Sequence, residues 1–130
     1  MSKSKNNTIN ICLPENKLRK QIMSIQTDST PMEATKDPSK CNVFGIYSLI
    51  APDSSVEELS SQYKAGGMGY GQAKLQLFEC ILEHFAKERE LYDYFHQNPD
   101  EVYIALAKGA EKARKVAREV ILRVRDKAGY

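Results

Sequence analysis

The sequence has few cysteines, no long apolar run and little net charge. Its three cysteines, Cys12, Cys41 and Cys80, are widely spaced and odd in number, which argues against a disulfide framework and favours a reducing cytosol. Its longest apolar run, residues 43–51, is far too short to cross a bilayer, and its start does not resemble a signal peptide. We therefore expect a soluble, cytoplasmic protein.

Two kinds of functional motif are also missing. Cys80 and His84 are four residues apart, but no CxxC spacing adds further metal ligands and nothing orients the histidine as a base. We expect no metal site there, only a core cysteine and a half-exposed histidine. Residues 66–71 (GGMGYG) lack the preceding strand and following Lys-Ser/Thr of a P-loop. They predict a helix end and a tight turn, with Tyr70 packing on the helices.

The net charge of +2 conceals an uneven distribution. Residues 1–24 contain five Lys or Arg against one Glu, and residues 108–130 contain eight against three Asp or Glu. Both ends of the chain are basic and its middle is acidic. An anionic partner is therefore expected to meet the ends.

The first half of the chain mixes short elements with a long loop. Residues 8–13 (TINICL) are β-prone and predict a short strand. Residues 15–23 predict a helix with Leu18, Ile22 and Ile25 on one side.

Residues 26–41 contain two prolines and no apolar period, which predicts a long loop of functional interest. The Thr27-Asp28-Ser29 triplet in this loop offers one carboxylate and two hydroxyls, which make a poor site for Mg²⁺. We expect Asp28 to order the entrance of the loop through bonds to the backbone.

Everything from residue 42 onward predicts helices. Asn42 is a candidate N-cap for 42–51. Asp53 or Ser54 is a candidate N-cap for the next helix, with a capping box if the cap is Ser54, and Gly66 and Gly67 end it. A helix over 71–97 keeps apolar side chains at spacings of three and four, and Asn98-Pro99 breaks it. Its expected stripe is Leu75, Phe78, Leu82, Phe85, Tyr92 and Phe95.

The last helix carries one stripe of aliphatic and small residues, which would let a neighbouring helix approach closely. Its members are Leu106, Ala110, Ala113, Ala117, Val120, Val124 and Ala128. The pattern as a whole predicts a mainly α protein: a helical bundle behind a short α/β remnant.

The chain opens with MSKSKNNT, which is polar and offers nothing to bury. Lys3 and Lys5 stand among small hydroxyl and amide side chains. Such a stretch is typical of a solvated tail, and equally of a mobile loop whose ammonium groups close over a phosphate.

A resemblance favours the second interpretation for a parent enzyme, whereas for this chain alone we expect a solvated tail. MSKS is the last four-fifths of KMSKS, the nucleotide-binding loop of class I aminoacyl-tRNA synthetases. It is followed, in order and spacing, by LPENKLRKQIMSIQTDS, NVFGIYSLIA, EELSSQYKAGGMGYGQAK and KGAEKARKVAREV. Together these stretches resemble the C-terminal third of bacterial tryptophanyl-tRNA synthetases. The first lysine of the motif and the upstream nucleotide-binding fold and tryptophan pocket are not in the chain.

The resemblance implies a ligase that activates tryptophan with Mg²⁺ and ATP through an adenylate. It implies that residues 1–25 are the tail of a Rossmann-type catalytic domain, 26–41 a linker and 42–130 a helical C-terminal domain. Lys3 would be the catalytic residue, because its ammonium would stabilise the departing pyrophosphate. The implied ATP-binding residues are Met1, Ser2, Lys3 and Ser4.

The resemblance also implies that the helical domain receives the anticodon arm of tRNA(Trp). The candidate tRNA-binding residues are Lys108, Lys112, Arg114, Lys115 and Arg118. Glu111 and Glu119 lie at helical spacing from these cations, so a self-compensated, solvated face is the alternative.

The parent enzyme is expected to be a homodimer, and this chain alone an inactive monomer or weak associate. A free-standing helical RNA-binding or scaffold module without catalysis is the rival hypothesis.

Overall fold

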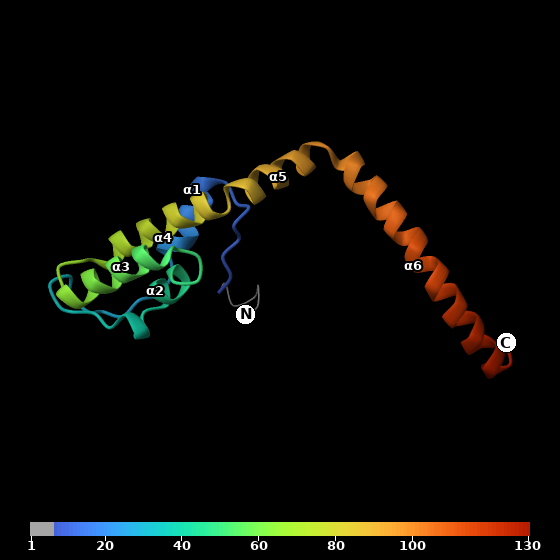
Figure 1. Cartoon of the computed structure of the whole chain (residues 1–130), viewed down its shortest axis with the longest axis horizontal. Helices are drawn as coiled ribbons and strands as arrows, with labels where there is room; N and C mark the ends of the chain where they lie inside the picture. The colour runs from blue at the N-terminus through green and yellow to red at the C-terminus, as the bar shows by residue number, and fades with distance from the viewer. Residues whose placement is uncertain (1–6) are drawn as a thin grey trace. The chain divides into compact units, whose positions relative to one another are not determined.

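The computed structural model describes residues 7–130, so the predicted ATP-binding residues 1–4 lie outside the described part of the chain. The described residues form six α-helices and one short 3-10 helix, Pro38–Lys40, with no strand among them (Figure 1). The mainly α fold is confirmed. The chain divides into two compact units, Met1–Glu90 and Leu91–Tyr130.

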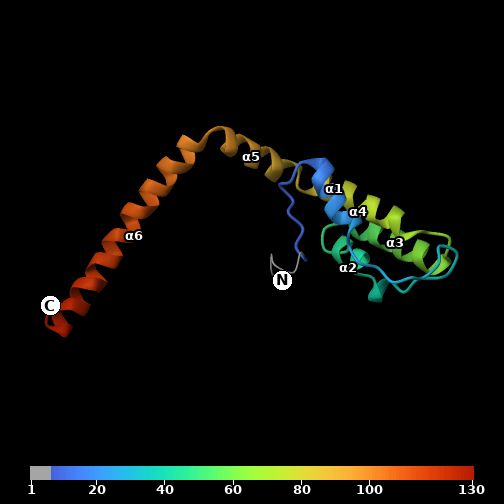
Figure 2. The same cartoon turned by 180° about the vertical axis from the view of Figure 1, so that it is seen from behind.

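The first unit is built around helix α1 (Glu15–Met23), which packs against α4 (Tyr70–His84). These two helices lie side by side when the chain is seen from the front and from behind (Figures 1 and 2). Leu18 and Ile22 are fully buried and Ile25 packs against the same core, as the spacing predicts.

The strand predicted over residues 8–13 is wrong. The backbone groups of this segment bond to side chains instead of to a neighbouring strand. The Gln21 amide donates to the Thr8 carbonyl (2.7 Å) and accepts from the Asn10 N–H (3.0 Å). The Arg89 guanidinium donates to two backbone carbonyls of the segment. β propensity alone makes no strand where no partner strand is present to complete the ladder.

Helix α2 (Asn42–Tyr47) is shorter than the predicted 42–51, because a tight turn follows it. Its N-cap is Cys41, so the predicted Asn42 cap is one residue late. The Asn42 amide instead donates to the Gln26 carbonyl (3.4 Å), which ties α2 to the preceding loop.

Helix α3 (Asp53–Ala65) begins one residue earlier than a cap at Asp53 would allow, and two earlier than a cap at Ser54 would allow. Pro52 occupies the N-cap position, and its carbonyl accepts from the N–H groups of Ser55 and Val56 (3.0 and 3.1 Å). Gly66 ends α3 with a φ of +79°, as predicted.

The predicted helix over 71–97 is two helices, α4 and α5 (Ala86–Gln97), separated at Phe85. Phe85 leaves the helical region (φ −104°, ψ 18°), and its side chain packs against the core. The most deeply buried residues of α4 are Ala73, Leu77 and Ile81, a face adjoining the predicted stripe. Three predicted members, Phe78, Leu82 and Phe85, are only partly buried.

The core of the first unit is completed by α2 and α3. Its largest fully buried side chains outside α1 and α4 are Tyr63, Leu59 and Val43. The rings of Phe44 and Tyr70 flank the Tyr63 ring, with centroids at 5.8 and 6.1 Å.

The second unit contains the end of α5 and helix α6 (Pro99–Ala128). Pro99 occupies the first helical position, so the predicted break at Asn98-Pro99 is confirmed. Inside this unit the Tyr94 hydroxyl donates to the Glu101 carboxylate (2.6 Å) across that break. No residue of α6 is buried. Among the described helices, none is long and apolar enough to cross a membrane.

Two adjacent glycines at the end of α3 provide a matched test of backbone packing. Both have positive φ, +79° at Gly66 and +83° at Gly67. A Cβ on Gly66 would lie 2.6 Å from the Glu33 carbonyl oxygen, whereas a Cβ on Gly67 would meet nothing within 4 Å. We expect Gly66→Ala to lower the free energy of unfolding by about 3 kcal/mol, because strain and a backbone clash add.

Gly67→Ala is the control, with an expected loss of about 1 kcal/mol from its left-handed backbone alone. Urea unfolding followed by near-UV circular dichroism, to which the buried Tyr63 contributes, measures both. Equal losses for the two variants would show that the contact with Glu33 does not constrain Gly66.

Candidate functional site

The loop of residues 26–41 is held in place by Asp28 and Tyr70. The Asp28 carboxylate accepts from the Thr30 N–H (2.9 Å) and from the Tyr70 hydroxyl (2.8 Å). Bonds from Thr30 and then from Tyr70 hold the pKa of Asp28 below its usual value. Burial, reinforced by the bond to Asp28, raises the pKa of Tyr70 to about 12. The prediction that Asp28 orders the loop is confirmed.

Lys36 is the least expected residue of this loop, because it is a lysine with only 5% of its surface exposed. Its ammonium donates to the carbonyls of Pro31 (2.8 Å), Met32 (3.2 Å) and Ala34 (3.2 Å). It also lies 5.3 Å from the centre of the Tyr70 ring, within reach of a cation–π attraction. Lys36 therefore folds residues 31–36 around its own charge.

Two backbone bonds fasten this loop to the end of α3. The Lys36 N–H donates to the Tyr63 carbonyl (2.8 Å), and the Gly67 N–H donates to the Met32 carbonyl (2.9 Å). The loop and the GGMGYG turn are thus one structure, in which Tyr70 packs edge-on against Tyr63. The predicted helix end and packed Tyr70 are confirmed. The arrangement is structural, since its polar groups are already bonded to one another.

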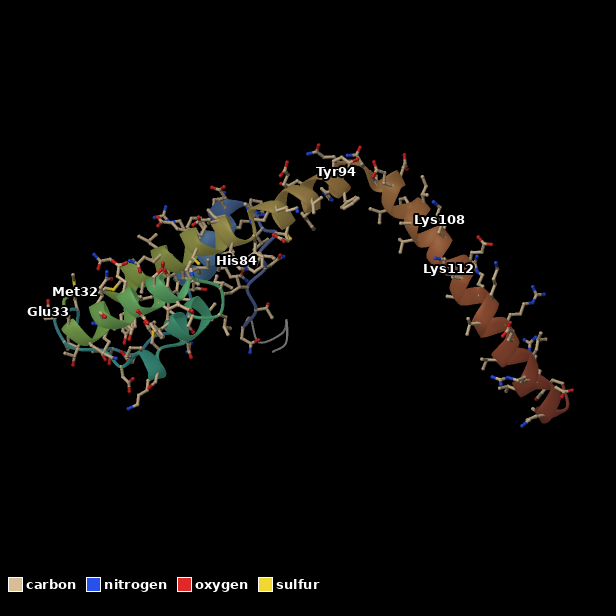
Figure 3. All side chains as sticks on the ribbon, in the orientation of Figure 1. Met32, Glu33, His84, Tyr94, Lys108 and Lys112 are labelled. Atoms are coloured by element: carbon tan, nitrogen blue, oxygen red, sulfur yellow. The ribbon has the colours of Figure 1, made fainter. Side chains whose placement is uncertain are left out.

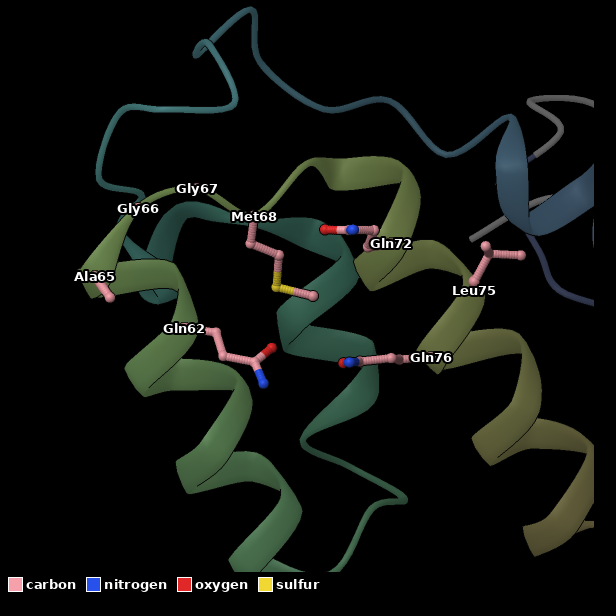
Figure 4. Close-up of a pocket in the computed structure, with 8 residues that line it drawn as sticks. All are labelled: Gln62, Ala65, Gly66, Gly67, Met68, Gln72, Leu75 and Gln76. Atoms are coloured by element: carbon pink, nitrogen blue, oxygen red, sulfur yellow. The ribbon is translucent and has the colours of Figure 1, made fainter.

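An open pocket of about 490 Å³ lies beside this turn, between α3 and α4. The carboxamides of Gln62, Gln72 and Gln76 line it together with Met68 (Figure 4). Gln72 also accepts from the Gly69 N–H (3.3 Å), and Gln62 donates to Glu58 (3.2 Å). The positions of these glutamines in the sequence form no recognisable motif, so the sequence alone could not have predicted this pocket.

A larger cavity, about 720 Å³, lies where the described chain begins. Its wall includes residues 7–9, the end of α1, residues 39–42 and part of α2. It therefore adjoins the segment that follows the MSKS residues.

Cys80 and His84, the pair considered above as metal ligands or as a nucleophile and base, differ in their surroundings. Cys80 is half-buried against the core, and burial raises the pKa of its thiol. His84 is exposed, with its ring edge-on to Phe85 at 4.7 Å. In the part of the chain that the structure describes, no three His, Cys, Asp or Glu side chains come together as metal ligands.

The five candidate tRNA-binding cations all lie exposed on α6, where Figure 3 labels two of them. They are Lys108, Lys112, Arg114, Lys115 and Arg118. Lys115 pairs with Glu111 at 3.8 Å, four residues earlier, and both side chains are highly exposed. Such a pair contributes little stability, so the helix keeps its positive surface.

No family model matches the chain. Curated relatives do match it over almost its whole length. It is 43% identical over 129 residues to the tryptophan–tRNA ligases of Rhodopirellula baltica and Campylobacter jejuni, covering 99% of this chain and 40% of each relative. A crystal structure of the Campylobacter jejuni tryptophanyl-tRNA synthetase complexed with ADP and tryptophan superposes with a TM-score of 0.90 at 42% identity. That match covers 100% of this chain and 41% of the solved one.

The chain is therefore homologous, from end to end, to part of an aminoacyl-tRNA synthetase. The relatives that it matches in this way are bacterial tryptophanyl-tRNA synthetases, whose helical C-terminal portion it resembles. It spans about two-fifths of the length of the curated relatives.

The contribution of the buried Lys36 ammonium to stability can be measured by removing its charge. Lys36→Met keeps most of the side-chain volume but leaves three carbonyls without their shared donor. We expect it to lower the free energy of unfolding by about 3 kcal/mol, since bonds to a buried charged donor are lost. Urea unfolding of the purified chain measures the change.

The matched control is Lys40→Met, in the same loop. Lys40 is exposed and its ion pair with Asp37, at 3.8 Å, is solvated, so we expect almost no change. A Lys36→Met variant as stable as Lys40→Met would mean that the loop does not depend on the buried charge.

Proposed function

We propose that the chain is the C-terminal part of a tryptophan–tRNA ligase, which activates tryptophan with ATP and transfers it to tRNA(Trp) in the cytoplasm. The supporting observation is the end-to-end match, at 42–43% identity and a TM-score of 0.90, to enzymes of that name. Local motifs alone would be weaker support, because a string as short as MSKS also arises by chance.

Lys3 is the residue of this chain that we assign to the chemistry. The tryptophan carboxylate attacks the α-phosphorus of ATP, a P–O bond forms, and the bond to the departing pyrophosphate breaks. Negative charge then grows on the leaving oxygens, where the Lys3 ammonium stabilises the transition state more than the ground state. Met1, Ser2 and Ser4 complete the ATP-binding loop, which closes over the nucleotide and opens to release products.

Mg²⁺ would enter with ATP and neutralise part of the phosphate charge. The Thr27-Asp28-Ser29 triplet does not fit a Mg²⁺ site, because its one carboxylate, that of Asp28, is already engaged by Thr30 and Tyr70. Mg²⁺ commonly binds through one or two carboxylates together with substrate phosphates, so we assign it to the ATP phosphates and not to this triplet.

We assign residues 1–25 to the tail of the catalytic domain, 26–41 to a linker and 42–130 to the helical domain. Helix α1, in residues 1–25, packs against α4, in residues 42–130, which supports a close association of these two parts. The parent enzyme acts as a homodimer, and the 130-residue polypeptide alone is an inactive monomer or weak associate.

The catalytic assignment is tested in a chimera that joins the N-terminal portion of the Campylobacter jejuni enzyme to this chain. We expect the chimera to catalyse tryptophan-dependent ATP–pyrophosphate exchange and the 130-residue chain to catalyse none. Lys3→Ala is expected to slow exchange by about a hundredfold or more, because one charge-stabilising donor is removed.

Lys5→Ala is the control for this experiment, since it removes an equal charge two residues away and should leave exchange nearly unchanged. A Lys3→Ala chimera as active as the parent chimera would refute the role of Lys3. An inactive chimera, or exchange by the chain alone, would contradict the ligase assignment.

The positive surface of α6 is assigned to the tRNA. Its cations would contact phosphates and position the RNA without reading its sequence. We expect Lys112→Gln combined with Arg114→Gln to weaken binding of tRNA(Trp) by the chimera and to lower the salt slope by about 1 for each lost phosphate contact. Filter binding at several salt concentrations measures both quantities.

Arg123→Gln combined with Arg125→Gln removes the same charge from the same helix, outside the candidate set. If both double variants weaken binding equally, general positive charge and not these positions attracts the tRNA.

A further inference from the structure

Helix α6 carries one continuous apolar face, which we call the α6 stripe. Its members follow one another at intervals of three or four residues, so they share a side of the helix. From the first to the last member the stripe covers 23 residues, or about 33 Å of helix. The stripe consists of Val102, Leu106, Ala110, Ala113, Ala117, Val120 and Val124.

The aliphatic members of the stripe are open to solvent. The exposed fractions of Val102, Leu106, Val120 and Val124 lie between 38% and 62%. Helices in proteins gain most of their stability from packing of such a face. A contiguous exposed apolar surface of this length marks an interaction site.

The stripe itself contains no charged or polar residue, and the cations of α6 lie on its other sides. RNA phosphates would meet those cations, which leaves the stripe for a protein surface. The alanines in its middle would admit a second helix at close range.

The lengths of the relatives indicate which protein surface this is. The 129 matched residues are 40% of the Rhodopirellula baltica relative, so roughly 190 of its residues lie outside the match. The solved Campylobacter jejuni enzyme keeps a counterpart of this whole chain, α6 included, within a chain of which it forms 41%. A large protein surface of the same polypeptide is thus available to cover the stripe.

We propose that the α6 stripe docks on the portion of the tryptophanyl-tRNA synthetase polypeptide that lies outside this chain. The proposal rests on the ligase assignment above. It makes α6 a two-sided helix, with charged sides toward the tRNA and an apolar side against the rest of the enzyme.

The test compares cysteine labelling at matched positions in the isolated chain and in the chimera. Val124→Cys lies on the stripe and Leu122→Cys lies off it, and both parent side chains are 55% exposed. Leu106→Cys (62%) and Ile104→Cys (58%) form a second matched pair. Maleimide labelling is quantified peptide by peptide by mass spectrometry, so the native cysteines do not interfere.

We expect all four sites to react at similar rates in the 130-residue chain. In the chimera, positions 106 and 124 should react at least about tenfold more slowly, because a covered thiol reacts only through local opening. Positions 104 and 122 should keep their rates.

Equal labelling of positions 122 and 124 in the chimera overturns the proposal. So does protection of 124 in the isolated chain that grows with concentration, which would identify a second copy as the occupant, or protection that requires tRNA. Exchange activity of the same chimera is measured in parallel. An active chimera with an unprotected stripe removes the docking proposal alone, whereas an inactive one counts against the ligase assignment.

Discussion

The first unit depends on one charge that has been taken out of water. The ammonium of Lys36 is surrounded by three carbonyls of residues 31–34, which replace its hydration. To bring these carbonyls together, the chain must turn back toward α3, and there the Glu33 carbonyl comes so close to Gly66 that no side chain fits. The loop, the end of α3 and the start of α4 are therefore specified together, and a change at one is felt at the other two.

Sequence reasoning succeeded where one physical rule acts locally. The spacing of Leu18 and Ile22 could only produce one buried face on a helix of nine residues, and Gly66 could end α3 because it adopts positive φ. Sequence reasoning failed where the buried face of a helix is decided by distant parts of the chain. Helix α4 is apolar on two adjoining faces, and only its packing against α1 and α2 selects Ala73 and Leu77 as the deepest positions.

The residues of the candidate site also differ in how far the sequence predicts them. Asp28 was predictable, because a carboxylate at a loop entrance bonds to nearby N–H groups. Lys36 was not, since lysine is almost always exposed and nothing in the sequence marks this one as buried. The cations of α6 were found by counting charges, but their surroundings follow from the structure, which leaves them on a helix without a buried residue.

The two units differ in what stabilises each of them. The first has its own core, with seven large side chains almost completely removed from water, and is expected to fold without help. Helix α6 has no such core, since none of its residues is buried. Because most helical stability in proteins comes from packing of an apolar face, a partner that covered this face would stabilise α6. If both proposals above hold, a protein surface and an RNA would contact different sides of α6 and would not compete for the same side chains.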